Sequence, residues 1–396
     1  MPDNLFLYLL LVVALGIGYA VGRIEKRRRV SGTGTQALPQ EYFRGLNHLL
    51  NERPDLAIDT FIQAMAVNND TVDTHLALGS LVRRRGEVDK AIRIHQNLLA
   101  RPVLSNANRA LAELELARDY YVAGLLGRAE SLLKELIQKN GEHKQVALEL
   151  LLEVYQRESD WPAAIEIGSL LSRQDKSVRI KLAHFRCEMA EQALRVGDLR
   201  GARWQVSSAL SFDASCARAN LIGAQVEFKA GRYRDVMRLL KKVREQDILL
   251  TTEGLNLYRE AAVALGDESE FLTYVREAVK KKPLLGLVKV LGEHISVAQD
   301  QAAAREYVVE QLLHHPSLGA FVLLMELLEQ ADEPLQGQHL KLVLDLAREL
   351  LKAQPRYRCN SCGFSGNMRM WQCPSCHQWG TLKPIQPIQL ERPDFA

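Results

Sequence analysis

The chain has 396 residues, 47% of them apolar, which excludes wholesale disorder and gives enough length for two or three structural units. Its 51 basic and 48 acidic residues nearly balance, so there is no overall electrostatic case for binding nucleic acid. Aromatic residues make up only 6%, whereas leucine and alanine are abundant, and this composition favours helices over sheets.

The amino terminus predicts a membrane anchor over residues 1–22. Residues 5–22 carry no charge, and at about 1.5 Å per residue they span about 27 Å as a helix, close to the thickness of a bilayer core. A basic block follows at once, formed by Arg23, Lys26, Arg27, Arg28 and Arg29. A cleaved signal peptide would carry its positive charge before the apolar run. The positive-inside rule therefore predicts a single-pass span with the bulk of the chain in the cytoplasm.

Ala14, Gly18 and Gly22 recur every four residues on one face of that span. Glycine is common in membrane helices, which accounts for the pattern without any partner. The alternative is a packing face for another membrane protein or for a second copy of the chain. Residues 23–39 then combine the basic block with a short, polar, glycine-bearing stretch, and we interpret them as a juxtamembrane segment and flexible linker.

Residues 40–354 predict an all-α tetratricopeptide-repeat solenoid. One position recurs at intervals of 34, 38, 35, 38, 34, 35 and 33 residues, and it is occupied by Ala57, Ala91, Ala129, Ala164, Ala202, Val236, Phe271 and Ala304. A period near 34 with a helix–turn–helix pattern inside it is typical of tetratricopeptide repeats. An unrelated helical bundle is the alternative, but a bundle has no reason to keep a near-constant period.

The repeats have further recurring positions. Small residues on the first helix of each repeat would allow the second helix to approach closely, and they are Gly45, Gly79, Ala117, Ala190 and Ala224. Glycines fall at or near the turns between helices, at Gly86, Gly127, Gly197, Gly231 and Gly266. Such an array presents a long concave surface suited to a helix or an extended peptide from a partner. Cys187 and Cys216 lie inside helical patterns, and we expect them to be buried free thiols.

Residues 355–386, here called the four-cysteine unit, contain two CxxC pairs separated by ten residues: Cys359, Cys362, Cys373 and Cys376. Two such turns can supply four thiolates to one tetrahedral Zn or Fe ion. Two disulfides, or four unrelated thiols, are the alternative interpretation. With four thiolate ligands no coordination position remains open, so we expect one structural ion per chain, with no other cofactor. Residues 387–396 form a tail.

Three further residues with chemistry of interest lie beside the cysteines. His377 adjoins Cys376 but is redundant as a ligand once four thiolates are present. Trp371 and Trp379 flank the second pair, and we expect them to build the small core around the metal, since so small a unit has little else to bury.

Motifs for catalysis are absent from the sequence, which has no phosphate-binding GxxxxGK[ST] loop, no HExxH, no GxSxG and no strand–GxGxxG–helix context. No catalytic residue is therefore predicted, and the chain is expected not to be an enzyme.

The order of parts resembles the lipopolysaccharide assembly protein B family of Gram-negative bacteria across the whole chain. The resemblance is tightest in residues 357–364 (YRCNSCGF) and 371–376 (WQCPSC). The first segment is also similar to a rubredoxin knuckle. Only ten residues separate the two knuckles here, which departs from true rubredoxins and favours a structural metal over a redox centre.

The resemblance implies an adaptor at the bacterial inner membrane. Such a protein would engage the membrane-anchored AAA+ protease FtsH and promote degradation of the lipid A pathway deacetylase as its client, which regulates lipopolysaccharide biosynthesis. A non-proteolytic scaffold for the lipopolysaccharide transport machinery is the alternative. A third interpretation is a nucleic-acid or redox protein built around the four cysteines. The near-neutral charge and the membrane anchor argue against nucleic-acid binding. A homodimer is compatible with both the small-residue face and the repeats.

Overall fold

A computed structural model describes part of the chain, and this part comprises residues 47–48, 60, 72–102, 104–172, 175, 177–315, 317–329, 344–345, 347–349, 351–352 and 354–385. The predicted anchor, the linker, Ala57 and the tail lie outside these residues. Within them, no helix is both long enough and apolar enough to cross a membrane. The chain divides into two compact units, residues 1–143 and 144–396, which are described separately.

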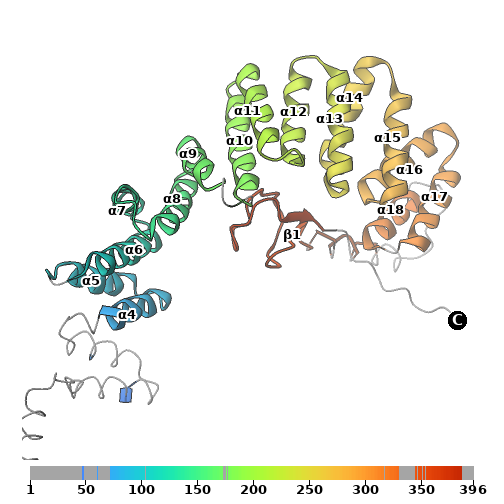
Figure 1. Cartoon of the computed structure of the whole chain (residues 1–396). Coiled ribbons are helices and arrows are strands. Elements are labelled where there is room, and N and C mark those ends of the chain that lie inside the picture. The colour runs from blue at the N-terminus through green and yellow to red at the C-terminus, as the bar shows by residue number, and fades with distance from the viewer. Residues whose placement is uncertain are drawn as a thin grey trace, which may run out of the picture. The chain divides into compact units, whose positions relative to one another are not determined.

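In the described part of the first unit, residues 72–143, two helical hairpins are formed (Figure 1) by α4 (Val72–Arg84), α5 (Val88–Leu99), α6 (Asn106–Val122) and α7 (Leu126–Gln138). A buried polar network joins the first three. Asp119 accepts hydrogen bonds from Arg83 (2.8 Å) and pairs with His95 Nδ1 (2.5 Å), and Arg83 also pairs with Glu115 (2.7 Å). A satisfied network of this kind fixes how the helices stack, because a shift would leave buried charges without partners.

The second unit is also built as a series of packed hairpins. Its helices are α8 (Lys144–Glu158), α9 (Trp161–Leu171), α10 (Ser177–Arg195), α11 (Leu199–Phe212), α12 (Ala217–Lys229), α13 (Tyr233–Gln246), the short 3₁₀ helix η1 (Ile248–Gly254), α14 (Leu255–Leu265), α15 (Glu268–Lys281), α16 (Leu285–Ala298), α17 (Gln301–His314) and α18 (Leu318–Glu329). Figure 1 shows α10 to α15 standing side by side in chain order.

The predicted repeat is confirmed by where its recurring residues lie. Every described member falls on the second helix of a hairpin and is buried against the first: Ala91, Ala129, Ala164, Ala202, Val236, Phe271 and Ala304. Of the small residues predicted on the first helices, Gly45 lies outside the described residues, and Gly79, Ala117, Ala190 and Ala224 are buried, the three alanines with 0% of their surface exposed. The described helices therefore form a tetratricopeptide-like solenoid, in which small residues on both helices permit close packing.

Local sequence signals mark the hairpin turns. Four second helices begin after an aspartate whose carboxylate accepts a backbone N–H three residues later, namely Asp160, Asp198, Asp267 and Asp300. Such caps satisfy an N–H group that has no partner within the helix. Four of the five predicted turn glycines adopt positive φ. Gly127 is the exception: it lies inside α7, and Gly124 (φ +76°) makes that turn.

The four-cysteine unit adds a small antiparallel sheet to an otherwise helical structure. Its strands are β1 (Tyr357–Cys359), β2 (Ser365–Gly366) and β3 (Leu382–Pro384), in the spatial order β2-β1-β3. Tyr357 pairs with Gly366 on one side and with Pro384 on the other. The unit has its own core, in which Cys359, Cys373 and Leu382 are buried. Cys187 and Cys216 are buried free thiols in the array, as predicted.

Candidate metal centre and its contact with the repeat array

The structure brings the four predicted cysteines together. Their Sγ atoms all lie within 4.8 Å of one another, and the pairs Cys359–Cys376 and Cys362–Cys373 are each 3.7 Å apart. A regular tetrahedron with metal–sulfur bonds of about 2.3 Å has edges of about 3.8 Å. The arrangement therefore fits one tetrahedral ion, and all four cysteines are free rather than disulfide-bonded.

Each CxxC pair forms a tight turn. Gly363 has φ +79° and donates its N–H to the Cys359 carbonyl (2.9 Å), a conformation that a residue without Cβ adopts easily. In the second turn His377 has φ +56° and donates its N–H to the Cys373 carbonyl (2.9 Å). His377 is not a member of the cluster of candidate ligands, so its position beside Cys376 serves the turn.

Hydrogen bonds around two of the sulfurs favour the thiolate form. The hydrogen bond between Cys359 and the Thr381 hydroxyl (3.3 Å), helped by backbone N–H groups, lowers the pKa of Cys359 to about 6. The backbone N–H of Phe364 lowers the pKa of Cys362. Burial instead raises the pKa of Cys373 to about 11. Since a metal binds the thiolate, Cys359 and Cys362 are better prepared for an ion than Cys373 is.

The two tryptophans of the unit correct one prediction. They were expected to build the core around the metal, but that core consists of the cysteines with Leu382, Tyr357, Phe364 and Met370. Trp371 packs instead against the hydrophobic core of α12 to α16, and Trp379 packs against α9 and α10. The cysteines themselves fill most of so small an interior, so the large indole rings are buried more completely against the array.

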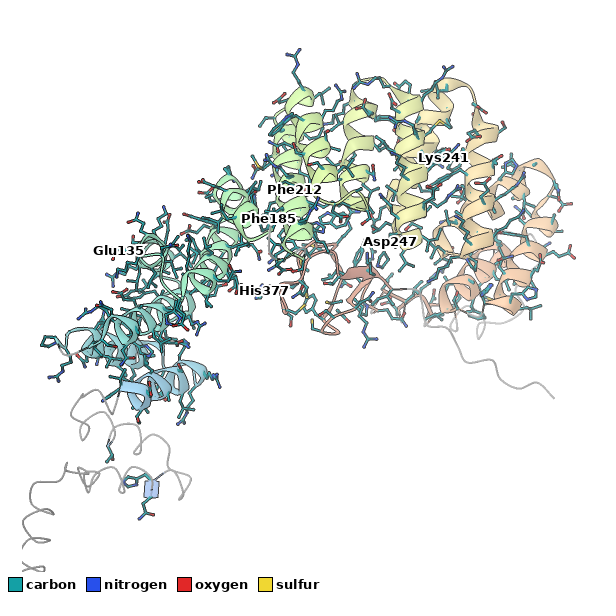
Figure 2. All side chains as sticks on the ribbon, in the orientation of Figure 1. Glu135, Phe185, Phe212, Lys241, Asp247 and His377 are labelled. Atoms are coloured by element: carbon teal, nitrogen blue, oxygen red, sulfur yellow. The ribbon has the colours of Figure 1, made fainter. Side chains whose placement is uncertain are left out.

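Trp379 lies at the centre of an aromatic cluster that joins the unit to the array. Its ring stacks on His184 (centroids 5.1 Å apart) and meets Trp161 (6.2 Å) and Phe185 (5.7 Å) edge to face. Its indole N–H donates to the Gln156 side chain (3.3 Å). With 8% of its surface exposed, Trp379 contributes through both burial and ring geometry. Figure 2 shows Phe185 where the array meets the four-cysteine unit.

Arg218, near the start of α12, carries a positive charge into the same contact. It is only 2% exposed, and its guanidinium lies 5.1 Å from the Trp371 ring centroid and 6.0 Å from that of Trp379. Glu188 (2.8 Å) and Glu191 (3.0 Å) on α10 balance its charge. Arg218 therefore connects α10 and α12 of the array to the two tryptophans through ion pairs and cation–π contacts.

Polar contacts surround this centre. Glu253 on η1 accepts from the Tyr357 hydroxyl (2.8 Å) and from Arg369 (2.9 Å), and Lys383 on β3 pairs with Asp247. Asp247 is visible in Figure 2 at the end of α13 nearest the unit. Strands β1 and β3 and the segment after β2 thus each have a charged or hydroxyl contact to the array, and together these contacts fix the orientation of the unit.

His184 is neutral in this environment. Burial, with the positive charges of Arg218 and Lys383 nearby, lowers its pKa to about 3. The His184 ring also restricts the side chain at position 380. Gly380 has φ +68°, and a Cβ at this position would lie 3.3 Å from His184 Nε2. Sequence analysis missed His184 and Arg218, because neither stands near the cysteines in the chain nor carries a motif.

Comparison with known proteins agrees with this geometry. The family described as rubredoxin metal binding domain matches residues 357–384. Lipopolysaccharide assembly protein B of Escherichia coli (strain K12) is 34% identical over 384 residues, covering 96% of this chain and 98% of the relative. The protein of that name from Haemophilus influenzae (strain ATCC 51907 / DSM 11121 / KW20 / Rd) is 31% identical over 394 residues, again covering 96% and 98%.

Among solved structures, the crystal structure of MamA protein covers 46% of this chain and 95% of its own, at 18% identity and a TM-score of 0.34, and so low a score carries no weight. The assignment comes from the sequence relatives, which match nearly the whole length, and from the domain match that contains all four cysteines. This chain belongs to the lipopolysaccharide assembly protein B family.

Proposed function

We propose that this protein is a membrane-anchored adaptor that regulates lipopolysaccharide biosynthesis by promoting FtsH-dependent degradation of the lipid A pathway deacetylase. The observation that carries the proposal is the match to relatives named lipopolysaccharide assembly protein B over 96% of the chain. In this proposal residues 5–22 span the bacterial inner membrane once, and the repeats and the four-cysteine unit face the cytoplasm, where they hold the client beside the protease.

The four-cysteine unit would bind one Zn or Fe ion through Cys359, Cys362, Cys373 and Cys376, with a structural role. Its sulfur separations fit a tetrahedral ion, and its own core is too small to fold unaided. Bound metal would hold Trp371 and Trp379 where Arg218 and the array meet them. The unit and the array then form one rigid surface, as an adaptor needs to hold a client in a fixed position.

The half-life of the lipid A deacetylase tests this proposal. In cells depleted of the protein we expect a longer half-life, restored by the full-length chain but not by a chain lacking residues 1–22. A Cys359→Ser/Cys362→Ser variant should fail to restore turnover, whereas Cys187→Ala, which changes a thiol outside the unit, should restore it. If deacetylase turnover is the same with and without the protein, the adaptor role is wrong.

A non-proteolytic scaffold for the lipopolysaccharide transport machinery is the second candidate. The name of the relatives, which speaks of assembly, favours this role. Unchanged deacetylase turnover combined with loss of transport-complex assembly in depleted cells would support this role over the first.

A further inference from the structure

Among the four candidate metal ligands, Cys362 is the one with an exposed side chain. Cys359 and Cys373 are buried, with 2% and 0% of their surface exposed, and Cys376 is partly buried. A cysteine that binds a metal is a thiolate, which is also the form that reacts with oxidants. Of the thiolates that would hold the ion, the Cys362 sulfur is therefore the one that a small oxidant in solution reaches first.

A buried sulfur of the other CxxC pair lies close to Cys362. The Sγ atoms of Cys362 and Cys373 are 3.7 Å apart, and Cys373 has no exposed surface. Cys359, in the same CxxC pair as Cys362, lies 3.7 Å from Cys376 instead, and its sulfur is also bonded to the Thr381 hydroxyl (3.3 Å). An oxidised Cys362 sulfur is therefore most readily attacked by Cys373, which is near and is itself shielded from the oxidant.

The reaction balances as a two-electron oxidation by a hydroperoxide. The Cys362 thiolate attacks one oxygen of hydrogen peroxide, the O–O bond breaks, and a sulfenic acid and a hydroxide are formed. The Cys373 thiolate then attacks the Cys362 sulfur and displaces a second hydroxide, which leaves a disulfide between the two. The two sulfurs lose the two electrons that the peroxide oxygens gain. Only Cys359 and Cys376 then remain as thiolates, too few to hold a structural ion that needs four ligands.

The turn that contains Cys373 also carries both tryptophans that contact the array. Trp371 and Trp379 stand on its two arms, which are joined by a hydrogen bond from the Gly380 N–H to the Trp371 carbonyl (2.7 Å). A covalent S–S bond is much shorter than the 3.7 Å that separates Cys362 from Cys373, so the turn must move when the bond forms. Loss of the ion at the same time removes what holds so small a unit folded. Both effects displace the tryptophans.

We propose that Cys362 is an oxidation site, at which a hydroperoxide forms a disulfide to Cys373, releases the metal and frees Trp371 and Trp379 from the array. The proposal rests on the proposed binding of a metal by the four cysteines. It goes beyond that binding because it makes the contact between the four-cysteine unit and the array depend on oxidants. The unit would thus connect oxidising conditions to the surface that the array and the unit form together.

The test treats the full-length chain, in non-ionic detergent and loaded with zinc, with increasing amounts of hydrogen peroxide. Zinc has no redox chemistry, so any oxidation takes place at sulfur. We expect stoichiometric release of zinc, detected with a chromogenic chelator, together with a red shift of the tryptophan emission. Dimedone, which traps sulfenic acids, should label Cys362 about tenfold more than it labels any of the other three ligands.

Mass spectrometry of tryptic peptides identifies the disulfide. Trypsin cuts after Arg358 and Arg369, so the two CxxC pairs lie on different peptides. A disulfide between Cys362 and Cys373 joins these peptides, whereas a disulfide within one pair does not. Zinc alone should not restore the tryptophan emission of the oxidised chain, but a thiol reductant followed by zinc should. A chain stripped of zinc by a chelator, without oxidant, should recover with zinc alone.

The matched control, Cys187→Ala/Cys216→Ala, removes two thiols of the array that are 0% and 5% exposed, and it should release zinc as the unchanged chain does. Dimedone labelling that favours another cysteine, a disulfide within one CxxC pair, zinc retained after Cys362 is oxidised, or an unchanged emission after zinc release would each overturn the proposal. A chain that does not take up zinc would refute the metal assignment as well, whereas zinc that binds and survives the oxidation refutes this inference alone.

Discussion

Replacing Arg218 by alanine tests whether the four-cysteine unit is held to the array by the contacts described above. The change is made in the array and not at a cysteine, so all four metal ligands are kept. Arg218→Ala removes two cation–π contacts, to Trp371 and Trp379, and two ion pairs, to Glu188 and Glu191. We therefore expect the unit to separate from the array while it keeps its metal.

The magnitude follows from the geometry. The Trp371 contact at 5.1 Å is desolvated and contributes about 2 kcal/mol, whereas the Trp379 contact at 6.0 Å contributes about 0.5 kcal/mol. The Glu188 and Glu191 side chains are 26% and 34% exposed, so each ion pair is screened and contributes about 0.5 kcal/mol. The sum is a loss of about 3 to 4 kcal/mol.

Tryptophan fluorescence during denaturant unfolding measures the loss, because Trp161, Trp371 and Trp379 all lie in or against the contact. We expect a red-shifted emission and a lower midpoint at unchanged metal content. Arg186→Ala is the matched control, since Arg186 lies 4.9 Å over the exposed ring of Trp204, away from the unit. If both variants shift equally, or if a double-mutant cycle of Arg218→Ala with Trp371→Leu gives no coupling, the reasoning fails.

The remaining predictions concern the metal, pH and one backbone position. Cys359→Ser/Cys362→Ser should abolish metal binding, measured by elemental analysis, and expose the tryptophans; retained stoichiometric metal would contradict the assignment of the ligands. Folding lowers the pKa of His184 to about 3 from its unfolded value of about 6.5. As the pH falls below about 6.5, the unfolded chain therefore takes up a proton at His184 before the folded chain does, which favours unfolding. The free energy of unfolding should be lower by about 2 kcal/mol at about pH 5 than above about pH 6.5. A His184→Gln variant should lack that part of the slope in denaturant titrations, and an identical slope would refute it. In thermal unfolding, Gly380→Ala should destabilise the protein by about 1 kcal/mol more than Gly231→Ala does. Both glycines adopt positive φ, but only a Cβ at Gly380 would contact another side chain, that of His184. Equal losses in the two variants would count against the His184 contact.

The repeat array shows what periodicity can predict. Alanine at one position every 34 or so residues requires that a second helix approach closely there, and Ala91, Ala164 and Ala202 are all fully buried at the helix pair. Turn positions were less certain. Gly127 was predicted at the turn, but Gly124, three residues earlier, makes it. A shift of three residues in the turn moves the start of the next helix without changing the repeat period, so the period alone does not locate the turn.

The four cysteines could be predicted because their chemistry is local. Two residues between paired cysteines bring both sulfurs to one side of a turn, and the structure places all four within 4.8 Å. The tryptophans beside them were interpreted wrongly for the opposite reason. Their neighbours in the sequence suggested a core around the metal, whereas the surfaces that bury them belong to α9, α10 and α12, far away in the chain.

The sequence by itself determined the repeat period, the family and the candidate metal ligands, because each depends on residues at fixed short spacings or on similarity along the whole chain. The tertiary structure alone decided what the four-cysteine unit contacts. Arg218 and His184 acquire their roles from burial and from charges on other helices, and burial depends on how the helices pack, which no spacing in the sequence records.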